Sequence, residues 1–179
     1  MHDMQTARGA SLNSPSDQKH RPISLFTSVA LVVYVLDQAT KVWAVARLEG
    51  EPPITLIRGV FEFGFLRNPG AAFGMGESIT PVLTVLMIVI AGAVLLAATR
   101  MRHPGWAVAL GLLLGGAVGN ITDRIFREPG PFRGHVVDFL HLNHWPVFNI
   151  ADCAITVAAV LVVILSWRGI GLDGTTSKK

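Results

Sequence analysis

The sequence predicts an all-α membrane protein built around four transmembrane helices. Hydrophobic residues make up 51% of the 179 residues and charged residues only 15%, and the mean hydropathy is +0.50. A transmembrane helix needs about 20 mostly apolar residues, and four stretches approach that length: residues 23–46, 81–98, 106–121 and 147–167. The Lys and Arg residues gather at the ends of these stretches, which suits a membrane surface better than a nucleic acid.

Each of the four stretches has its own reason to be read as a span. The first is expected to remain as an anchor, because no small-residue cleavage site follows it. The second contains no charged residue. The third and fourth are too short to cross a bilayer if they end at their first polar residue. The third must therefore extend over Asn120 and Asp123, and the fourth must include Asn149 and Asp152.

The segment between the first two spans, residues 48–78, has a β pattern instead of a helical one. Two adjacent prolines interrupt it, and residues 60–67 alternate so that three aromatic side chains share one face: Phe61, Phe63 and Phe65. Such alternation predicts a short β-strand. The following Asn68-Pro69-Gly70 is a turn signal.

Four spans place both ends of the chain on one side of the membrane. The short connection between the second and third spans carries Arg100 and Arg102, so the positive-inside rule makes that side cytoplasmic. The expected organisation is a disordered cytoplasmic arm (1–22), a four-helix membrane domain (23–170, with 48–78 as an extracytoplasmic β-rich segment) and a cytoplasmic tail (171–179).

Helix geometry places several polar residues at a similar depth. At 1.5 Å per residue, Asp37 and Asn120 lie about 20 Å above the inner ends of their spans, and Asp152 lies about 9 Å below the outer end of its span. In a hydrocarbon core about 30 Å thick, these residues converge near the outer leaflet. An ionisable group at membrane depth is costly and is a functional-site hypothesis by default.

The acidic residues fall into two groups, those with a basic residue nearby in the sequence and those without one. Asp37 with Lys41, and Asp123 with Arg127, are i, i+4 neighbours on a helix, so these pairs can simply neutralise each other. Asp138 and Asp152 have no basic partner nearby in the sequence. Two carboxyl groups in a partly desolvated pocket share a proton, and such a pair can activate water while polarising a carbonyl.

Other site chemistries fit the sequence less well. Three histidines are close to these acids in the sequence: His135, His141 and His144. No HExxH or CxxC spacing is present, so we expect no metal and no cofactor. The lone Cys153 excludes an intrachain disulfide, and no paired histidine is placed to make it a nucleophile.

Two functions of other classes fit the sequence less well. A small transporter or proton channel would need polar residues through the full depth of the bilayer, whereas the second span has no charged residue. A non-catalytic lipid-binding or assembly subunit, anchored by the three phenylalanines, would need no pair of acids.

Five motifs in order resemble those of the lipoprotein signal peptidase (signal peptidase II) family: DQATK (37–41), RNPGAAFG (67–74), GNITDR (119–124), VVDF (136–139) and FNIAD (148–152). The resemblance extends over about residues 24–167. Each motif alone is weak, and their combination and order are specific.

The resemblance implies an intramembrane aspartyl endopeptidase with a small extracytoplasmic β-cradle. Its substrates would be prolipoproteins carrying diacylglycerol, which it would cut before the lipidated cysteine. The catalytic dyad would be Asp138 and Asp152. Matching positions would bind substrate or brace the site: Asp37, Lys41, Asn68, Gly70, Asn120, Asp123, Arg124 and Asn149.

The expected setting is the bacterial inner (cytoplasmic) membrane, with both termini in the cytoplasm and the active site near the outer leaflet. Asp123 would have a structural role with Arg124 or Arg127. The expected partners are prolipoprotein substrates and membrane lipid, with no nucleic acid, and we expect the enzyme to act as a monomer.

Overall fold

Four long helices and one small sheet make up the part of the chain that the structure describes. The computed structural model describes residues 22–70 and 79–176; the predicted arm therefore lies almost entirely outside the described residues. The elements in order are α1 (Ile23–Leu48), β1 (Ile54–Ile57), β2 (Phe61–Asn68), α2 (Thr80–Ala98), α3 (Pro104–Phe126), β3 (Val136–Leu142) and α4 (Ile150–Trp167). All four helices are long and apolar enough to cross a membrane, which confirms the predicted fold class.

Helix α3 is the centre of the bundle. It packs against α1, α2 and α4. Half of the residues in its most apolar stretch are buried inside the protein, compared with 11% of those in α2. Glycines allow this close approach: a Cβ at Gly115 would lie 2.6 Å from the carbonyl oxygen of Ala30, and one at Gly116 would lie 2.7 Å from that of Ala151. Small residues at helix contacts are typical of membrane bundles, where backbones must pack closely.

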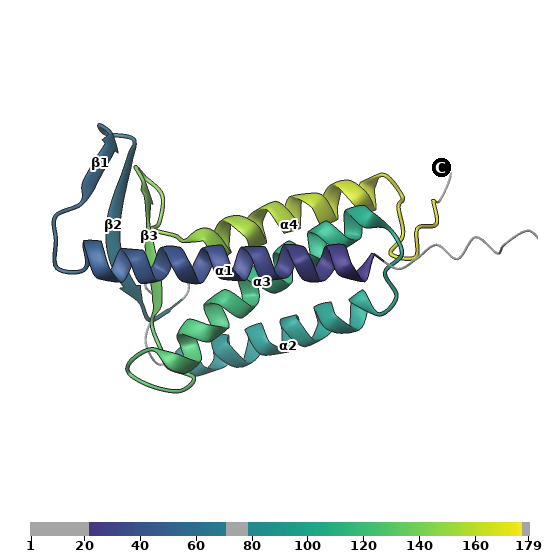
Figure 1. Ribbon diagram of the computed structural model, residues 1–179, viewed down its shortest axis with the longest axis horizontal. Helices are drawn as coiled ribbons and strands as arrows, with labels where there is room; N and C mark the ends of the chain where they lie inside the picture. Colours follow the sequence, from purple (N-terminus) through teal and green to yellow (C-terminus); the bar gives the residue numbers. More distant parts are fainter. Residues whose placement is uncertain (1–21, 71–78, 177–179) are drawn as a thin grey trace, which may run out of the picture.

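The three strands form one antiparallel sheet in the order β1-β2-β3, and the sheet lies across one end of the helical bundle (Figure 1). The strand predicted at residues 60–67 is confirmed as β2. An apolar cluster joins the sheet to the C-terminal end of α1: its buried members are Ala44, Leu48, Val137 and Phe139, with Phe63 and Phe65 packed against them. This cluster fixes the position of β3 relative to α1.

Several element boundaries differ from the predicted ranges, most of all the end of α3 and the start of α4. Helix α3 includes Asn120 and Asp123, as expected, and continues to Phe126. Helix α4 begins at Ile150, so the predicted start at residue 147 and the inclusion of Asn149 in the helix are wrong. Asn149 is the N-cap: its side chain accepts a hydrogen bond from the backbone N–H of Asp152, and the Asp152 side chain accepts one from the Asn149 N–H. This reciprocal capping box ends the extended segment and starts the helix.

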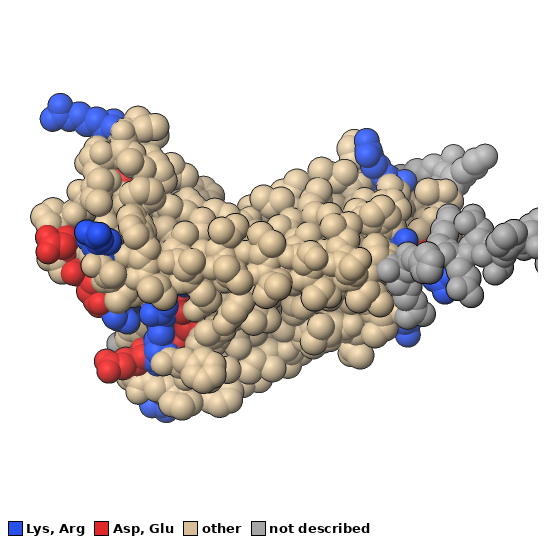
Figure 2. All heavy atoms as spheres, in the orientation of Figure 1, with Lys and Arg blue, Asp and Glu red and all other residues tan. Residues whose placement is uncertain are grey.

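The start of α1 and the end of α4 lie at the same end of the bundle, opposite the sheet (Figure 1). Beyond α4 the chain turns back on itself, with Ile170 paired to Thr176. The backbone N–H of Arg102 donates to Leu172 O at 2.8 Å, so this turn is tied to the loop between α2 and α3. Charged side chains gather at the two ends of the molecule, and the wide belt between them is uncharged on the visible face (Figure 2). That distribution is the one expected of a bilayer-spanning bundle.

Candidate active site

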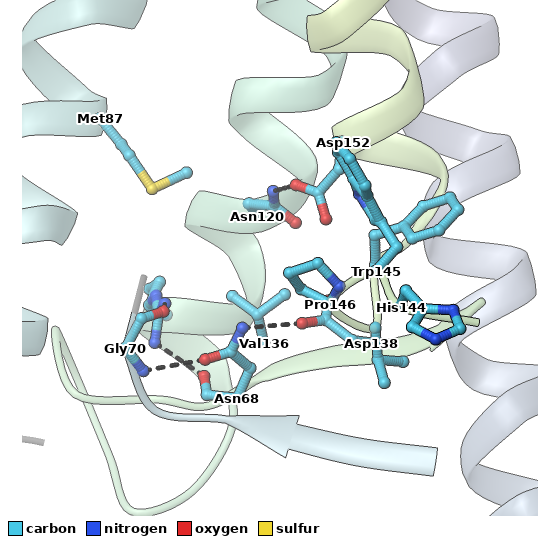
Figure 3. A pocket seen from close by; sticks show the side chains of 13 residues that line it. Asn68, Gly70, Met87, Asn120, Val136, Asp138, His144, Trp145, Pro146 and Asp152 are labelled. Carbon is cyan, nitrogen blue, oxygen red and sulfur yellow. Dashed lines mark hydrogen bonds between the residues drawn. The ribbon is translucent and has the colours of Figure 1, made fainter. Parts of the chain in front are cut away.

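Two carboxyl groups share one cavity of about 490 Å³ at the sheet end of the bundle. Asp138 comes from β3 and is 2% exposed, and Asp152 comes from the first turn of α4 (Figure 3). The cavity is lined by Asn68, Gly70, Met87, Asn120, Arg124, Val136, Asp138, His144, Trp145, Pro146, Val147, Phe148 and Asp152. It is therefore a partly apolar cavity with its polar groups drawn from β2, β3, α3 and α4.

Asn149 touches both carboxyl groups. Its side-chain Nδ2 donates to Asp138 Oδ1 at 2.6 Å, and its backbone N–H donates to Asp152 Oδ2 at 3.2 Å. Its Oδ1 accepts from the Asp152 N–H at 3.0 Å, which fixes which end of the amide faces Asp138. The helix cap of α4 therefore also joins the two acids.

Two further asparagines complete the hydrogen bonds of the acids. Asn120 Nδ2 donates to Asp152 Oδ1 at 3.0 Å, and Asn68 Nδ2 donates to Asp138 Oδ2 at 2.8 Å (Figure 3). Asn68 Oδ1 accepts from the Gly70 N–H at 3.0 Å. Each of the four carboxyl oxygens thus receives one N–H group.

Burial raises the pKa of Asp138 from 3.8 to about 7, and the neighbouring charge of Asp152 adds to this increase. The hydrogen bonds from Asn68 and Asn149, and the more distant charge of Lys41, act in the opposite direction. Desolvation and a like charge both favour the neutral carboxyl, and here they exceed the donors. At neutral pH, Asp138 therefore holds a proton for a large part of the time.

A buried ionic cluster lies beside the cavity. The ammonium of Lys41 is fully buried and contacts Asp37 Oδ2 at 2.9 Å, Asp123 Oδ2 at 2.9 Å and Asn120 Oδ1 at 2.8 Å. Asp123 also binds Arg127, with 2.6 Å between Oδ1 and Nε. Both i, i+4 pairs considered from the sequence are present, and Lys41 joins them into one cluster.

Asp37 and Asp123 also hold backbone groups of other elements. Asp37 Oδ1 accepts from the Ala151 N–H in the first turn of α4 at 3.0 Å, and Asp123 Oδ2 accepts from the Val137 N–H in β3 at 3.2 Å. The cluster therefore positions the two segments that carry the cavity acids.

Arg124 binds carbonyl groups and does not pair with Asp123. Its Nη1 donates to the carbonyl oxygens of Asn68, Pro69 and Gly134 at 3.0–3.1 Å, and its Nη2 donates to that of Gly70 at 2.8 Å. The guanidinium thus ties the end of β2 to the segment that precedes β3. This arrangement holds Asn68 against Asp138.

Seven lining residues were absent from the predicted site residues: Met87, Val136, His144, Trp145, Pro146, Val147 and Phe148. Trp145 is 65% exposed, and a lone tryptophan beside a span is a recognised signal of the membrane interface. His141 instead pairs with Glu62 on the neighbouring strand, at 2.8 Å. Within residues 22–70 and 79–176, no three His, Cys, Asp or Glu side chains form a group suited to a metal ion.

Residues 29–168 match the family described as Signal peptidase (SPase) II. The chain belongs to this family. Lipoprotein signal peptidase of Streptomyces griseus is 46% identical over 173 residues, covering 97% of this chain and 87% of that protein. The protein of the same name from Mycobacterium avium is 43% identical, covering 93% of this chain and 91% of that protein.

The fold also matches a solved structure described as a bacterial membrane enzyme determined by the in meso method at 2.3 Å resolution. The two chains are 26% identical, with a TM-score of 0.71 over 88% of this chain and 96% of the other. Membership of the signal peptidase II family and the four spanning helices make this protein a multi-pass membrane protease.

Proposed function

We propose that this protein is an intramembrane aspartyl endopeptidase that removes signal peptides from diacylglyceryl-modified prolipoproteins, cutting before the lipidated cysteine. The observation that carries the proposal is the pair of carboxyl groups, Asp138 and Asp152, joined through Asn149 in one cavity. Family membership supplies the class of reaction, and the names of the relatives indicate the class of substrate.

In the proposed mechanism the pair works with one proton between them. Asp138, whose pKa is about 7, carries this proton and hydrogen-bonds the scissile carbonyl oxygen. Ionised Asp152 takes a proton from a water molecule as its oxygen attacks the carbonyl carbon. The carbonyl oxygen accepts the Asp138 proton, which gives a neutral tetrahedral diol.

Breakdown of this intermediate reverses the roles of the two acids. Asp152 gives its newly acquired proton to the amide nitrogen of the cysteine, the C–N bond breaks, and Asp138 recovers a proton from the diol. The pair returns to its starting state with one water consumed. Asn68, Asn120 and Asn149 keep both carboxyl groups oriented throughout, because their amides are already hydrogen-bonded to them.

The setting of the cavity supports a lipid-anchored substrate. Its apolar lining includes Met87 of α2 and Trp145 of the loop before α4, and these lie on opposite sides of the cavity (Figure 3). The diacylglyceryl chains would remain in the outer leaflet while the peptide enters the cavity. Anchoring the substrate in this way orients the scissile bond and lowers the entropic cost of reaching the acids.

We further propose that the protein lies in the inner membrane with both termini in the cytoplasm and the cavity near the outer leaflet. Arg100 and Arg102 lie in the short loop between α2 and α3, and Arg168 follows α4, at the end opposite the sheet. The sheet end also carries arginines, among them Arg58, Arg67 and Arg133, so the short basic loop is the main support for a cytoplasmic side. The proposed units remain an arm (1–22), a membrane domain (23–170) and a tail (171–179). We also propose that the enzyme acts as a monomer.

The test uses purified enzyme and a prolipoprotein with or without diacylglycerol. Asp138→Asn and Asp152→Asn should each abolish cleavage, and mass spectrometry should find the lipidated cysteine at the new N-terminus. Asp173→Asn, at an exposed position at the opposite end of the bundle, is the matched control and should cleave normally. Wild-type cleavage by either cavity variant, or equal cleavage of unlipidated precursor, contradicts the proposal.

A further inference from the structure

The three asparagines at the acids each have to present an N–H group, and something must prevent each amide from rotating by half a turn. Asn149 is fixed because its Oδ1 accepts from the Asp152 N–H. Asn68 is fixed because its Oδ1 accepts from the Gly70 N–H. A backbone N–H can only donate, so these two amides have one allowed orientation.

No backbone donor contacts the Oδ1 of Asn120 in the described residues; Lys41 does, at 2.8 Å. An ammonium has three donors and no acceptor. Its other two contacts are carboxylate oxygens, on Asp37 and Asp123, so all three donors of Lys41 are used. The group of Asn120 that faces Lys41 must therefore be its oxygen, and its Nδ2 must face Asp152.

Asn149 alone would hold Asn120 weakly. The Asn149 Nδ2 also approaches Asn120 Oδ1, at 3.3 Å, but its shorter contact, at 2.6 Å, is with Asp138. Lys41 and Asn120 are both at most 6% exposed, so water does not compete freely for these contacts. The ammonium is the main group that sets the direction of the Asn120 amide.

We propose that Lys41 is a positioning residue of the reaction: its buried ammonium fixes the Asn120 amide so that Asn120 donates to Asp152 throughout the cycle. Without that constraint, a rotated Asn120 would place its oxygen against the Asp152 carboxylate and disturb the group that must accept the proton of water. This role goes beyond charge neutralisation and rests on the proposed function of Asp152.

Removing Lys41 alone would leave two buried carboxylates short of a partner, which destabilises a protein strongly. The variants are therefore made in an Asp37→Asn background, in which the loss of one positive and one negative charge cancels. Asn at position 37 keeps an oxygen for the Ala151 N–H. Lys41→Met and Lys41→Gln are both neutral, but only the glutamine retains an N–H that can donate to Asn120 Oδ1.

Cleavage of a diacylglyceryl-modified precursor is measured by single turnover with enzyme in excess, so that slow variants still give a rate. Relative to Asp37→Asn, adding Lys41→Met should lower the cleavage rate roughly 10- to 100-fold with little change in substrate affinity. Adding Lys41→Gln should recover at least about fivefold of that loss. In an Asn120→Ala background, adding the same Lys41→Met change should alter the rate less than about threefold, since the amide is absent.

Equal rates for the methionine and glutamine variants, a rate within about threefold of Asp37→Asn, or an undiminished loss in the Asn120→Ala background would each overturn the inference. Asp152→Asn is measured in the same assay. If it cleaves normally, the proposed function fails; if it is inactive while the Lys41 variants behave additively, only the role of Lys41 fails.

Discussion

Replacing Asp138 by asparagine removes a carboxyl group that the folded protein keeps protonated at pH values where an exposed aspartate is ionised. The pKa of this carboxyl is about 7 in the folded protein, compared with 3.8 for an unperturbed aspartate. Below pH 3.8 the group is protonated in both folded and unfolded chains, so its protonation contributes no pH dependence. Between these pKa values the folded chain binds the proton more strongly, so stability falls as the pH rises and levels off above about pH 7.

The size of this loss follows from the difference of about 3 pKa units. At 1.36 kcal/mol per unit, the wild-type protein loses about 4 kcal/mol across the whole range, of which about 2.5 kcal/mol falls between pH 5 and pH 8. Asp138→Asn has no such ionisation and should lose none of it. In Asp138→Asn an NH₂ group would face Asn68 or Asn149, so the absolute stability also changes. The test therefore compares how the stability of the two proteins changes with pH.

Thermal unfolding in lipid nanodiscs, followed by tryptophan fluorescence, measures the effect. From pH 5 to pH 8, the Tm of the wild-type protein should fall by about 5–10 °C relative to that of Asp138→Asn. Asp173→Asn changes an exposed aspartate and should follow the wild-type curve. Parallel curves for the wild-type protein and Asp138→Asn would refute the argument that burial holds the proton on this carboxyl.

Three further outcomes are expected. Gly119→Ala should lower the unfolding free energy by about 3 kcal/mol, because the new Cβ would press on the buried Asp37 carboxylate and disturb its ion pair. Chemical denaturation measures this loss. The control is Gly92→Ala, where an added Cβ meets nothing within 4 Å, and it should cause no loss. Arg124→Lys should reduce kcat/KM by roughly 10-fold or more, because one ammonium cannot replace a guanidinium that binds four carbonyl groups. Wild-type kinetics would show that cleavage does not need the Arg124 guanidinium to hold these carbonyl groups together. The kcat/KM for lipidated precursor should fall about tenfold per pH unit well above pH 7 as Asp138 loses its proton, and a flat profile to pH 9 would argue against Asp138 as the proton donor.

Apolar patterning was sufficient to predict the four helices and β2, because both depend on a local period. Strand β3 was not predicted, since Val136, Val137, Asp138 and Phe139 are all buried and a strand buried on both faces loses its alternation. The cap at Asn149 had a local signal, an Asn followed three residues later by an acid. The length needed to cross the bilayer favours a longer fourth span and outweighs this local signal.

The candidate site was predictable as a set of residues but not as a set of contacts. The sequence motifs named Lys41 and Asp123 separately, and each had a closer partner in sequence, Asp37 and Arg127. The 2.9 Å contact between Lys41 and Asp123 depends on how α1 and α3 pack, which no local spacing encodes. For the same reason, Arg124 could be named from its motif, whereas its four carbonyl partners lie 10 to 56 residues away.

In the proposed mechanism, the capping box at the start of α4 makes cleavage depend on synthesis of the fourth helix. Asn149 caps α4 and Asp152 lies in it, and α4 follows the other three helices in the chain; its first turn is held by Asp37 of α1. A partly synthesised chain has Asp138 but neither its second acid nor the amide that joins the two. The proposed enzyme would therefore cut no peptide until α4 has inserted and docked, which would protect the membrane from unfinished copies of its own protease.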